Sequence, residues 1–429
     1  MRIVQLTPGT GSFYCGSCFR DIALAKGLKS RGHDVVVAPL YLPFMLEEYE
    51  EERPVLLGGI NVYLQHKLPF LRHLPRFLQD WMDAPSLLRL ASRRASMTKA
   101  SELGEMTVSM LRGEEGRQVH ELEKLVAWLR GIGAPDALLL SNAMLVGLAR
   151  RLRAALGVPI YCTLQGEAPF LDALPAQHSR IAWETLGERA REIDAFLAVS
   201  RFTADLMSER LGLLAERVHV VPNGIDVEGA TAPAPVSSSS SGPPTIGFLA
   251  RLCADKGIDT LVEAFLQLKR RPGMEAVKLE AVGARLKEDR GLLRTLREKL
   301  ERAGCRRDVR FRANVTREQK LEFLGRIDVL SVPATYGESF GLYLLEAWAN
   351  GIPVVQPRHA AFPELIEATG GGLLCEPDDP GLLADGLEEL LSNPARAREL
   401  GAAGRAAVAS DFTADRMARD VERFCTPGA

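Results

Sequence analysis

Residues 336–357, YGESFGLYLLEAWANGIPVVQP, contain a glycine-bearing turn between an apolar run and a helix-like stretch. Residues 329–332 predict a strand, and residues from about 342 to 350 predict a helix. Main-chain N–H groups at the start of such a helix lack partners within it, so they suit a phosphate or a sugar hydroxyl. Glu338 lies in the turn and Glu346 lies in the helix, so both carboxylates can face one pocket. We therefore expect a ligand site at this strand end.

The same alternation of short apolar runs with helical patterns continues along the whole chain, which is typical of βαβ units and parallel sheets. In the first half the predicted strands are residues 3–6, 35–40, 60–65, 137–141, 160–164, 196–200 and 218–222. In the second half they are residues 245–249, 278–282, 309–311, 329–332, 353–356 and 373–375. The sequence predicts an α/β protein with two doubly wound sheets and with ligands at the carboxyl ends of the strands.

A stretch rich in serine, proline and glycine, EGATAPAPVSSSSSGPP at residues 228–244, separates the two halves. Such a composition cannot bury a core, so we interpret it as a flexible linker. It divides a first domain, residues 1–227, from a second domain, residues 245–410. A chain of 429 residues suits two domains, because single cores rarely exceed about 250–300 residues.

Residues 41–115 depart from the alternation and read mainly as amphipathic helix. Within them, residues 67–94 interleave bulky apolar side chains with arginines and a lysine. Two interpretations stay open: an inserted helical pair packed on the first domain, or a surface that contacts a membrane or a lipid.

The composition is that of a globular protein, and the chain lacks the excess of positive charge that is typical of proteins that bind nucleic acid. The formal net charge is −2 and the isoelectric point is about 6.4, so no nucleic-acid partner is expected. Seven cysteines, an odd number, resemble reduced thiols more than a disulfide framework. Residues 3–6 are too short for the apolar region of a signal peptide, and no segment is long enough to span a bilayer. We expect a cytoplasmic protein, with peripheral attachment to the inner membrane face as a second location.

The segment 336–357 resembles the E-x7-E signature of retaining glycosyltransferases of family 4. The GT-B fold of that family has two Rossmann-like domains that face a central cleft, and a C-terminal helix that crosses back to the first domain. The resemblance is carried by Gly337, Glu338, Phe340, Gly341, Glu346, Ala347, Gly351 and Pro353. It implies that Glu338 contacts the donor sugar and Glu346 binds the ribose hydroxyls of the nucleotide. It also implies a donor-binding turn made of Gly337, Ser339, Phe340, Gly341 and Leu342.

A second match, TIGFLARLCADKGIDTLVEAF at residues 245–265, places two cations between a predicted strand and a predicted helix. Negative charge grows on the diphosphate as it leaves the sugar, and Arg251 and Lys256 can stabilise it. In the family that the chain resembles, this arginine and lysine bind the diphosphate. VPNGID at residues 221–226 closes the first domain as in that family, and residues 411–429 are interpreted as the helix that returns to the first domain.

The predicted acceptor or sugar side lies on the first domain. Gln165 stands where many members of the family have a histidine, and an amide cannot titrate. Glu167 could orient an acceptor or the donor ring, or be a plain loop carboxylate. In the loop GTGSFYCGSC at residues 9–18, Gly9 and Gly11 allow close approach of a ligand.

Two thiols of that first loop and one hydroxyl on a later strand have alternative roles. Cys15 and Cys18 could bind zinc, act in redox chemistry, or line the substrate loop. Ser200 is interpreted as the cap of a helix rather than a ligand contact.

No Asp-x-Asp occurs in the chain, so the usual carboxylate pair for a metal diphosphate is absent. We therefore expect a transfer without metal and without a cofactor other than the nucleotide-diphosphate sugar. As is generally proposed for the family that the chain resembles, the departing phosphate oxygen would accept the proton of the acceptor. We expect the acceptor to be a glycan, a lipid-linked sugar or a small molecule. The alternatives are a sugar-nucleotide epimerase, or a redox-sensing or non-catalytic protein that binds nucleotide sugars.

Overall fold

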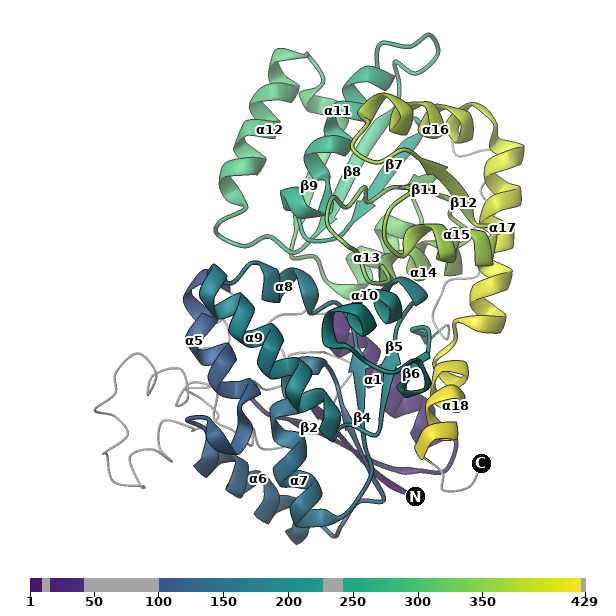
Figure 1. Ribbon diagram of the computed structural model, residues 1–429. Helices are drawn as coiled ribbons and strands as arrows, with labels where there is room; N and C mark the ends of the chain where they lie inside the picture. Colours follow the sequence, from purple (N-terminus) through teal and green to yellow (C-terminus); the bar gives the residue numbers. More distant parts are fainter. Residues whose placement is uncertain (10–15, 42–99, 227–241, 426–429) are drawn as a thin grey trace. The chain divides into compact units, whose positions relative to one another are not determined.

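The computed structural model describes residues 1–9, 16–41, 100–226 and 242–425 and divides the chain into two compact units (Figure 1). Unit 1 comprises Met1–Pro222 and Ala414–Ala429, and unit 2 comprises Asn223–Thr413. The predicted strand 60–65, the basic segment 67–94, and the residues Gly11 and Cys15 lie outside the described residues.

Unit 1 is built on a parallel sheet of six strands in the order β2-β1-β3-β4-β5-β6. In its centre, Ile3 of β1 pairs with Val35 of β2 and with Ala137 of β3. The strands are β1 (Arg2–Thr7), β2 (Asp34–Pro39), β3 (Ala137–Leu140), β4 (Ile160–Leu164), β5 (Ala195–Ala198) and β6 (Val218–Val220). Their positions confirm the predicted strands of the first half that fall on described residues.

Helices cover both faces of this sheet, because alternate strand residues point to opposite faces and both sets are apolar. One face packs against α1 (Gly16–Ser30) and α18 (Ala414–Cys425). The other packs against α5 (Ala100–Leu111), α6 (Val119–Gly131), α7 (Ala149–Leu156), α9 (Ala176–Arg189) and α10 (Arg201–Leu211). The short helix α8 (Ala168–Asp172) follows β4.

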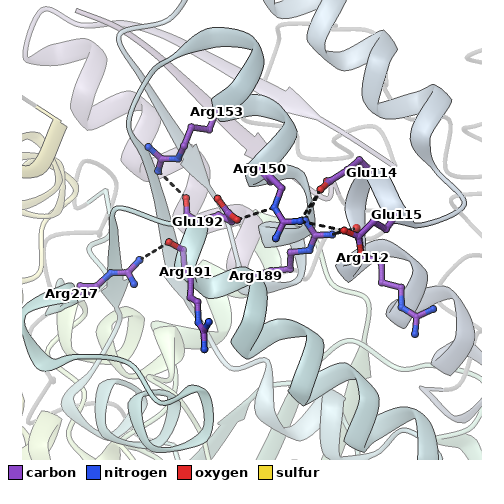
Figure 2. Close-up of polar contacts among 9 residues, drawn as sticks. All are labelled: Arg112, Glu114, Glu115, Arg150, Arg153, Arg189, Arg191, Glu192 and Arg217. Atoms are coloured by element: carbon purple, nitrogen blue, oxygen red, sulfur yellow. Dashed lines mark hydrogen bonds and ion pairs between the residues drawn. The ribbon is translucent and has the colours of Figure 1, made fainter.

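The described part of the predicted insertion, residues 100–115, is tied to unit 1 by arginines (Figure 2). Arg189 at the end of α9 is 3% exposed, and its Nη1 lies 2.7 Å from Glu114 Oε1. Its Nη2 donates to the main-chain oxygen of Arg112 at 2.6 Å. Arg150 of α7 bridges Glu114, Glu115 and Glu192. This network gives residues 112–115 a structural role within unit 1.

The C-terminal helix α18 packs against α1, and it starts at Ala414 instead of the predicted Asp411. A Cβ on Gly27 would lie 2.5 Å from the main-chain oxygen of Ala414, so the two helices need glycine there to approach. Arg31 binds Glu422 at 2.6 Å, and His33 Nε2 lies 3.0 Å from Glu422 Oε1. The preceding helix, α17 (Pro394–Asp411), belongs to unit 2.

Unit 2 has a second parallel sheet of six strands, in the order β12-β11-β10-β7-β8-β9. The strands are β7 (Thr245–Leu249), β8 (Lys278–Gly283), β9 (Val309–Ala313), β10 (Val329–Leu330), β11 (Val354–Pro357) and β12 (Gly372–Cys375). The helices, besides α17, are α11 (Ile258–Leu268), α12 (Arg290–Arg302), α13 (Arg317–Leu324), α14 (Leu342–Ala349), α15 (Phe362–Thr369) and α16 (Pro380–Ser392). The two sheets confirm the predicted class, an α/β protein with two doubly wound, Rossmann-like units.

Two details of unit 2 differ from the expectation. Strand β10 stops at Leu330, because the N–H of Val332 turns to the side-chain oxygen of Gln356 at 3.3 Å. The units divide after Pro222, because Ile225 pairs with Thr413 and donates its N–H to the oxygen of Phe412.

Acid should weaken the attachment of α18. Hydrogen bonds from His33 and Arg31 lower the pKa of Glu422 below its usual 4.5. A carboxylate with a lowered pKa stabilises the folded state above its unfolded pKa, and this contribution is lost as the pH falls below about 4.5. Urea unfolding should show Glu422→Gln to be less stable than the wild type at neutral pH, with a smaller difference near pH 3.5.

The control for this measurement is Glu184→Gln, which removes an exposed pair with Arg180 on α9. A Glu422→Gln difference that stays the same from neutral pH to pH 3.5 would count against a role for the ionised carboxylate.

Candidate functional site

Two loops of unit 2 meet at the carboxyl ends of β7 and β10. Gly257, between β7 and α11, has a φ of 72°, and a Cβ there would overlap the main-chain oxygen of Pro333. The N–H of Thr335 also donates to the main-chain oxygen of Asp255 at 3.0 Å. Since both contacts join main chain to main chain, the loop that carries Lys256 is fixed against the turn that carries Glu338.

Helix α14 begins at Leu342, as the sequence predicts, after a residue in the left-handed region. Gly341 has a φ of 85°, which favours glycine at the start of this helix. The N–H groups of Leu342 and Tyr343, in the first turn, have no acceptor within the helix. Phe340 is buried and packs against Phe412, with ring centroids 6.3 Å apart. The turn 337–342 thus presents main-chain donors while its aromatic residue anchors it.

Glu338 is held by one of its two oxygens. Lys256 Nζ lies 2.5 Å from Oε2, and the hydroxyls of Tyr336 and Tyr343 each donate to the same oxygen at 3.0 Å. Oε1 has no hydrogen bond to any residue that the structure describes. The residue is 7% exposed, and these three donors hold its side chain in place. Such a carboxylate can offer Oε1 to a ligand without losing its own support.

The two tyrosines also contact the cation. Lys256 Nζ donates to the Tyr336 hydroxyl and lies 4.7 Å from the centre of that ring, and 5.7 Å from the centre of the Tyr343 ring. Burial and the nearby charge of Glu338 raise the pKa of both phenols, so both remain protonated donors. Lys256 and Glu338 therefore form one unit with two aromatic side chains.

Arg251, the second predicted cation, is held by carboxylates that the sequence analysis did not single out. Its Nε and Nη2 bind Asp289 at 3.1 and 2.9 Å, and Nη2 also binds Glu288. Burial opposes the charge, but hydrogen bonds and charge from Asp289 and Glu288 outweigh it and raise the pKa of Arg251. Asp289 itself accepts the N–H of Leu286 at 2.7 Å. The other terminal nitrogen of Arg251, Nη1, has no partner within the described chain.

Glu346 projects from α14 and pairs with Lys320 of α13, whose Nζ lies 2.5 Å from Oε1. The carboxylate is 29% exposed, so it is accessible in part. The structure therefore places each carboxylate of the E-x7-E segment beside a lysine from another element. A local pattern could point to Tyr336 and Tyr343, which flank Glu338 in the same segment, but nothing local marks Lys320 or Asp289.

The predicted acceptor-side residues lie on unit 1. Gln165 follows β4, and its Nε2 donates to the main-chain oxygen of Ser141 at 2.5 Å. Glu167 is 5% exposed and accepts three main-chain N–H groups, from Ala143, Gln165 and Gly166, at 2.8 to 3.0 Å. Burial raises its pKa in spite of these bonds. These are the contacts of a loop carboxylate, and a role toward an acceptor stays a prediction.

Three further predicted residues have simple positions. Gly9 has a φ of 80° and lies just after β1. Cys18 is buried in α1. The roles suggested for Cys18 and Cys15 stay predictions. Ser200 accepts the N–H of Thr203 at 3.1 Å and caps α10, as expected.

Two kinds of feature are absent from the described residues. No cluster of three or more histidine, cysteine, aspartate or glutamate residues in the described ranges could hold a metal ion. Nor is any helix there long and apolar enough to cross a membrane.

The chain is similar to known glycosyltransferases in sequence. It is 28% identical to a GDP-mannose-dependent alpha-(1-6)-phosphatidylinositol monomannoside mannosyltransferase of Mycobacterium tuberculosis, over 71% of this chain and 76% of the relative. The enzyme of that name from Mycolicibacterium smegmatis is 29% identical over 82% of this chain and 90% of its own. A D-inositol 3-phosphate glycosyltransferase of Xylanimonas cellulosilytica is 31% identical over 50% of this chain and 52% of its own.

Solved structures share the fold. Sucrose-phosphate synthase of Thermosynechococcus elongatus superposes with a TM-score of 0.70 at 18% identity, over 99% of this chain and 98% of its own. Anabaena HepE in complex with UDP gives a TM-score of 0.69 at 18% identity, over 99% of both chains.

Two family models divide the chain between them. The model described as Glycosyltransferase Family 4 matches residues 104–228, and the model described as Glycosyl transferases group 1 matches residues 234–407. The second match contains all four predicted residues of unit 2: Arg251, Lys256, Glu338 and Glu346. The chain therefore belongs to glycosyltransferase family 4, and it is an enzyme with the GT-B fold.

Proposed function

We propose that this glycosyltransferase moves a sugar from a nucleoside-diphosphate sugar to a carbohydrate or lipid-linked acceptor, with retention of configuration and without a metal ion. The observation that carries the proposal is the arrangement around Glu338. Three donors fix Oε2, and Oε1 is left for a sugar hydroxyl, directly beside the ammonium group of Lys256. In the transition state of the transfer, the carboxylate would hold the sugar in position and the ammonium group would stabilise the charge on the phosphate.

In this mechanism the cations act on the leaving group. The bond between the anomeric carbon and the phosphate oxygen breaks, and the electron pair stays on the diphosphate. Lys256 and the Nη1 side of Arg251 stabilise that charge, while Asp289 holds the other edge of Arg251 in place. Glu346 would bind the ribose hydroxyls in exchange for part of its contact with Lys320.

The acceptor oxygen then bonds to the anomeric carbon on the face that the diphosphate leaves. Its proton passes to the departing phosphate oxygen, so no general base is needed from the protein. This route agrees with the amide of Gln165, which binds the oxygen of Ser141 and cannot accept a proton at neutral pH. Gln165 would hydrogen-bond a sugar hydroxyl.

The names of the relatives suggest which substrates to try first. Several are named GDP-mannose-dependent phosphatidylinositol monomannoside mannosyltransferases, and two are named D-inositol 3-phosphate glycosyltransferases. We therefore propose GDP-mannose as the first donor and a glycolipid or an inositol derivative as the first acceptor. Such an acceptor would place the protein in the cytoplasm, at the inner face of the membrane.

A panel of nucleotide sugars tests the proposal. We expect release of nucleoside diphosphate from at least one donor, and loss of about 100-fold or more in kcat for Glu338→Gln and Arg251→Ala, since each removes charge from the reacting centre. Donor binding without release would instead support the non-catalytic sensor, and an altered nucleotide sugar without transfer would support the epimerase.

Tyr343→Phe tests the contribution of a hydrogen bond to Glu338 while the charge of Glu338 is kept. The substitution removes one 3.0 Å hydrogen bond to Oε2 and little volume. A hydrogen bond to a charged group is worth about 1.5–3 kcal/mol, so kcat should fall about 10- to 100-fold with little change in donor KM. The control is Tyr161→Phe, which removes a hydroxyl that binds the oxygen of Phe424 in unit 1. Equal kcat values for both variants would contradict the role of Tyr343.

A chelator tests the expected independence from metal. Activity should be unchanged in excess EDTA and on addition of Mg²⁺ or Mn²⁺, because Arg251 and Lys256 would stabilise the negative charge of the diphosphate in place of a metal ion. Loss of activity in EDTA that Mg²⁺ or Mn²⁺ restores would show that a metal is required.

A further inference from the structure

A charged pair that the sequence analysis did not single out lies buried in unit 1. Arg20 and Asp21 are neighbours in α1, and they are 2% and 0% exposed. Nη1 of Arg20 lies 3.2 Å from Oδ1 of Asp21. The other two nitrogens, Nε and Nη2, are buried and have no hydrogen-bond partner among the described residues. A buried guanidinium is thus left with most of its donors unused.

The unused nitrogens form one edge of the group. The N–H bonds of Nε and Nη2 point the same way in a planar guanidinium, and this fork matches two oxygens of a single phosphate or carboxylate. The nitrogen that Asp21 engages lies outside this fork. Leaving buried charged donors unpaired is expensive, so an unsatisfied edge indicates a missing partner.

The surrounding elements hold Asp21 but do not supply that partner. Ser141, just after β3, donates its hydroxyl to Oδ2 of Asp21 at 2.5 Å, and Gln5 of β1 donates to the main-chain oxygen of Asp21 at 3.4 Å. Among the described residues, the thiol of Cys162 on β4 also interacts electrostatically with Arg20, and burial raises the pKa of this thiol, which keeps it neutral. Burial also raises the pKa of Asp21, although Arg20 and the Ser141 hydroxyl oppose this.

The same network reaches Gln165. Ser141 binds Asp21 through its hydroxyl and accepts the side-chain amide of Gln165 at its main-chain oxygen, at 2.5 Å in both contacts. Arg20 is therefore connected, through Asp21 and Ser141, to the residue that stands at the histidine position of the family. An anion bound to Arg20 would lie in the same part of unit 1 as Gln165.

We propose that the Nε and Nη2 edge of Arg20 binds a phosphate group, with Asp21 and Ser141 holding the guanidinium in place. The phosphate site itself follows from Arg20 alone. Its source rests on the proposed function: either the diphosphate of the donor or a phosphate carried by the acceptor.

The first test removes the donor-side cations, so that only the Arg20 site responds. In an Arg251→Ala, Lys256→Ala background, inorganic phosphate should raise Tm relative to chloride at equal ionic strength. Adding Arg20→Lys should weaken phosphate binding about tenfold or more by calorimetry, because lysine keeps the charge but loses the fork. The matched control is Arg180→Lys, an exposed arginine on α9. A folded Arg20→Lys variant that binds phosphate as tightly as its parent overturns the site.

The source of the phosphate is determined by comparing how the wild type and Arg20→Lys bind two kinds of ligand. Weaker binding of inositol 1-phosphate alone assigns the site to the acceptor, and weaker binding of GDP or UDP assigns it to the donor. The two proposals fail separately: phosphate binding through Arg20 without any turnover rejects only the glycosyl transfer proposed above. Turnover without any effect of Arg20→Lys on phosphate ligands rejects only the site.

Because a buried arginine can be needed for folding, a second measurement uses the unmodified chain. Crystals soaked in selenate should show an anomalous selenium peak within hydrogen-bond distance of Nε and Nη2 of Arg20. An ordered water in that place, with no selenium peak, overturns the proposal.

Discussion

The site on unit 2 depends on the contact between Lys256 and one oxygen of Glu338. Each residue lies in a loop after a different strand, and the contact exists only because those loops touch at their main chains. Gly257 permits this, since any side chain there would overlap the main-chain oxygen of Pro333. Removing either charge would leave the other unpaired in a largely buried position beside two phenols, which is costly. The main-chain contact of the two loops therefore fixes both motifs relative to each other and brings the pair together.

Both units bury opposite charges near the carboxyl ends of their strands, but they satisfy these charges differently. In unit 2, the hydroxyls of Tyr336 and Tyr343 bind one oxygen of Glu338, and its other oxygen has no hydrogen bond within the described part of the chain. In unit 1, both side-chain oxygens of Asp21 are hydrogen-bonded, while two nitrogens of Arg20 have no partner among the described residues. A carboxylate with a free oxygen suits a hydroxyl, and a guanidinium with a free fork suits an oxyanion.

The sequence could predict what depends on local patterns. Apolar runs located the strands of both sheets, and the spacing of glycines and carboxylates in residues 336–357 located Glu338 and Glu346. Contacts between distant residues leave no such pattern. Asp289 is 38 positions from Arg251, and Ser141 is 120 positions from Asp21, so their pairing is a product of the fold. The same reason explains why Arg20, an ordinary arginine in a helical stretch, did not stand out.

The partners of Arg251 bear on how a diphosphate could enter. Asp289 is buried and also holds the N–H of Leu286, so releasing it would disturb the loop before α12. Glu288 is 45% exposed and shares only Nη2. In the proposed mechanism, an incoming phosphate would therefore bind Nη1, which has no partner among the described residues, and would displace Glu288 while Asp289 stays bound. Under that proposal the guanidinium would rotate little on donor binding, so less of the binding free energy would be lost in rearranging it.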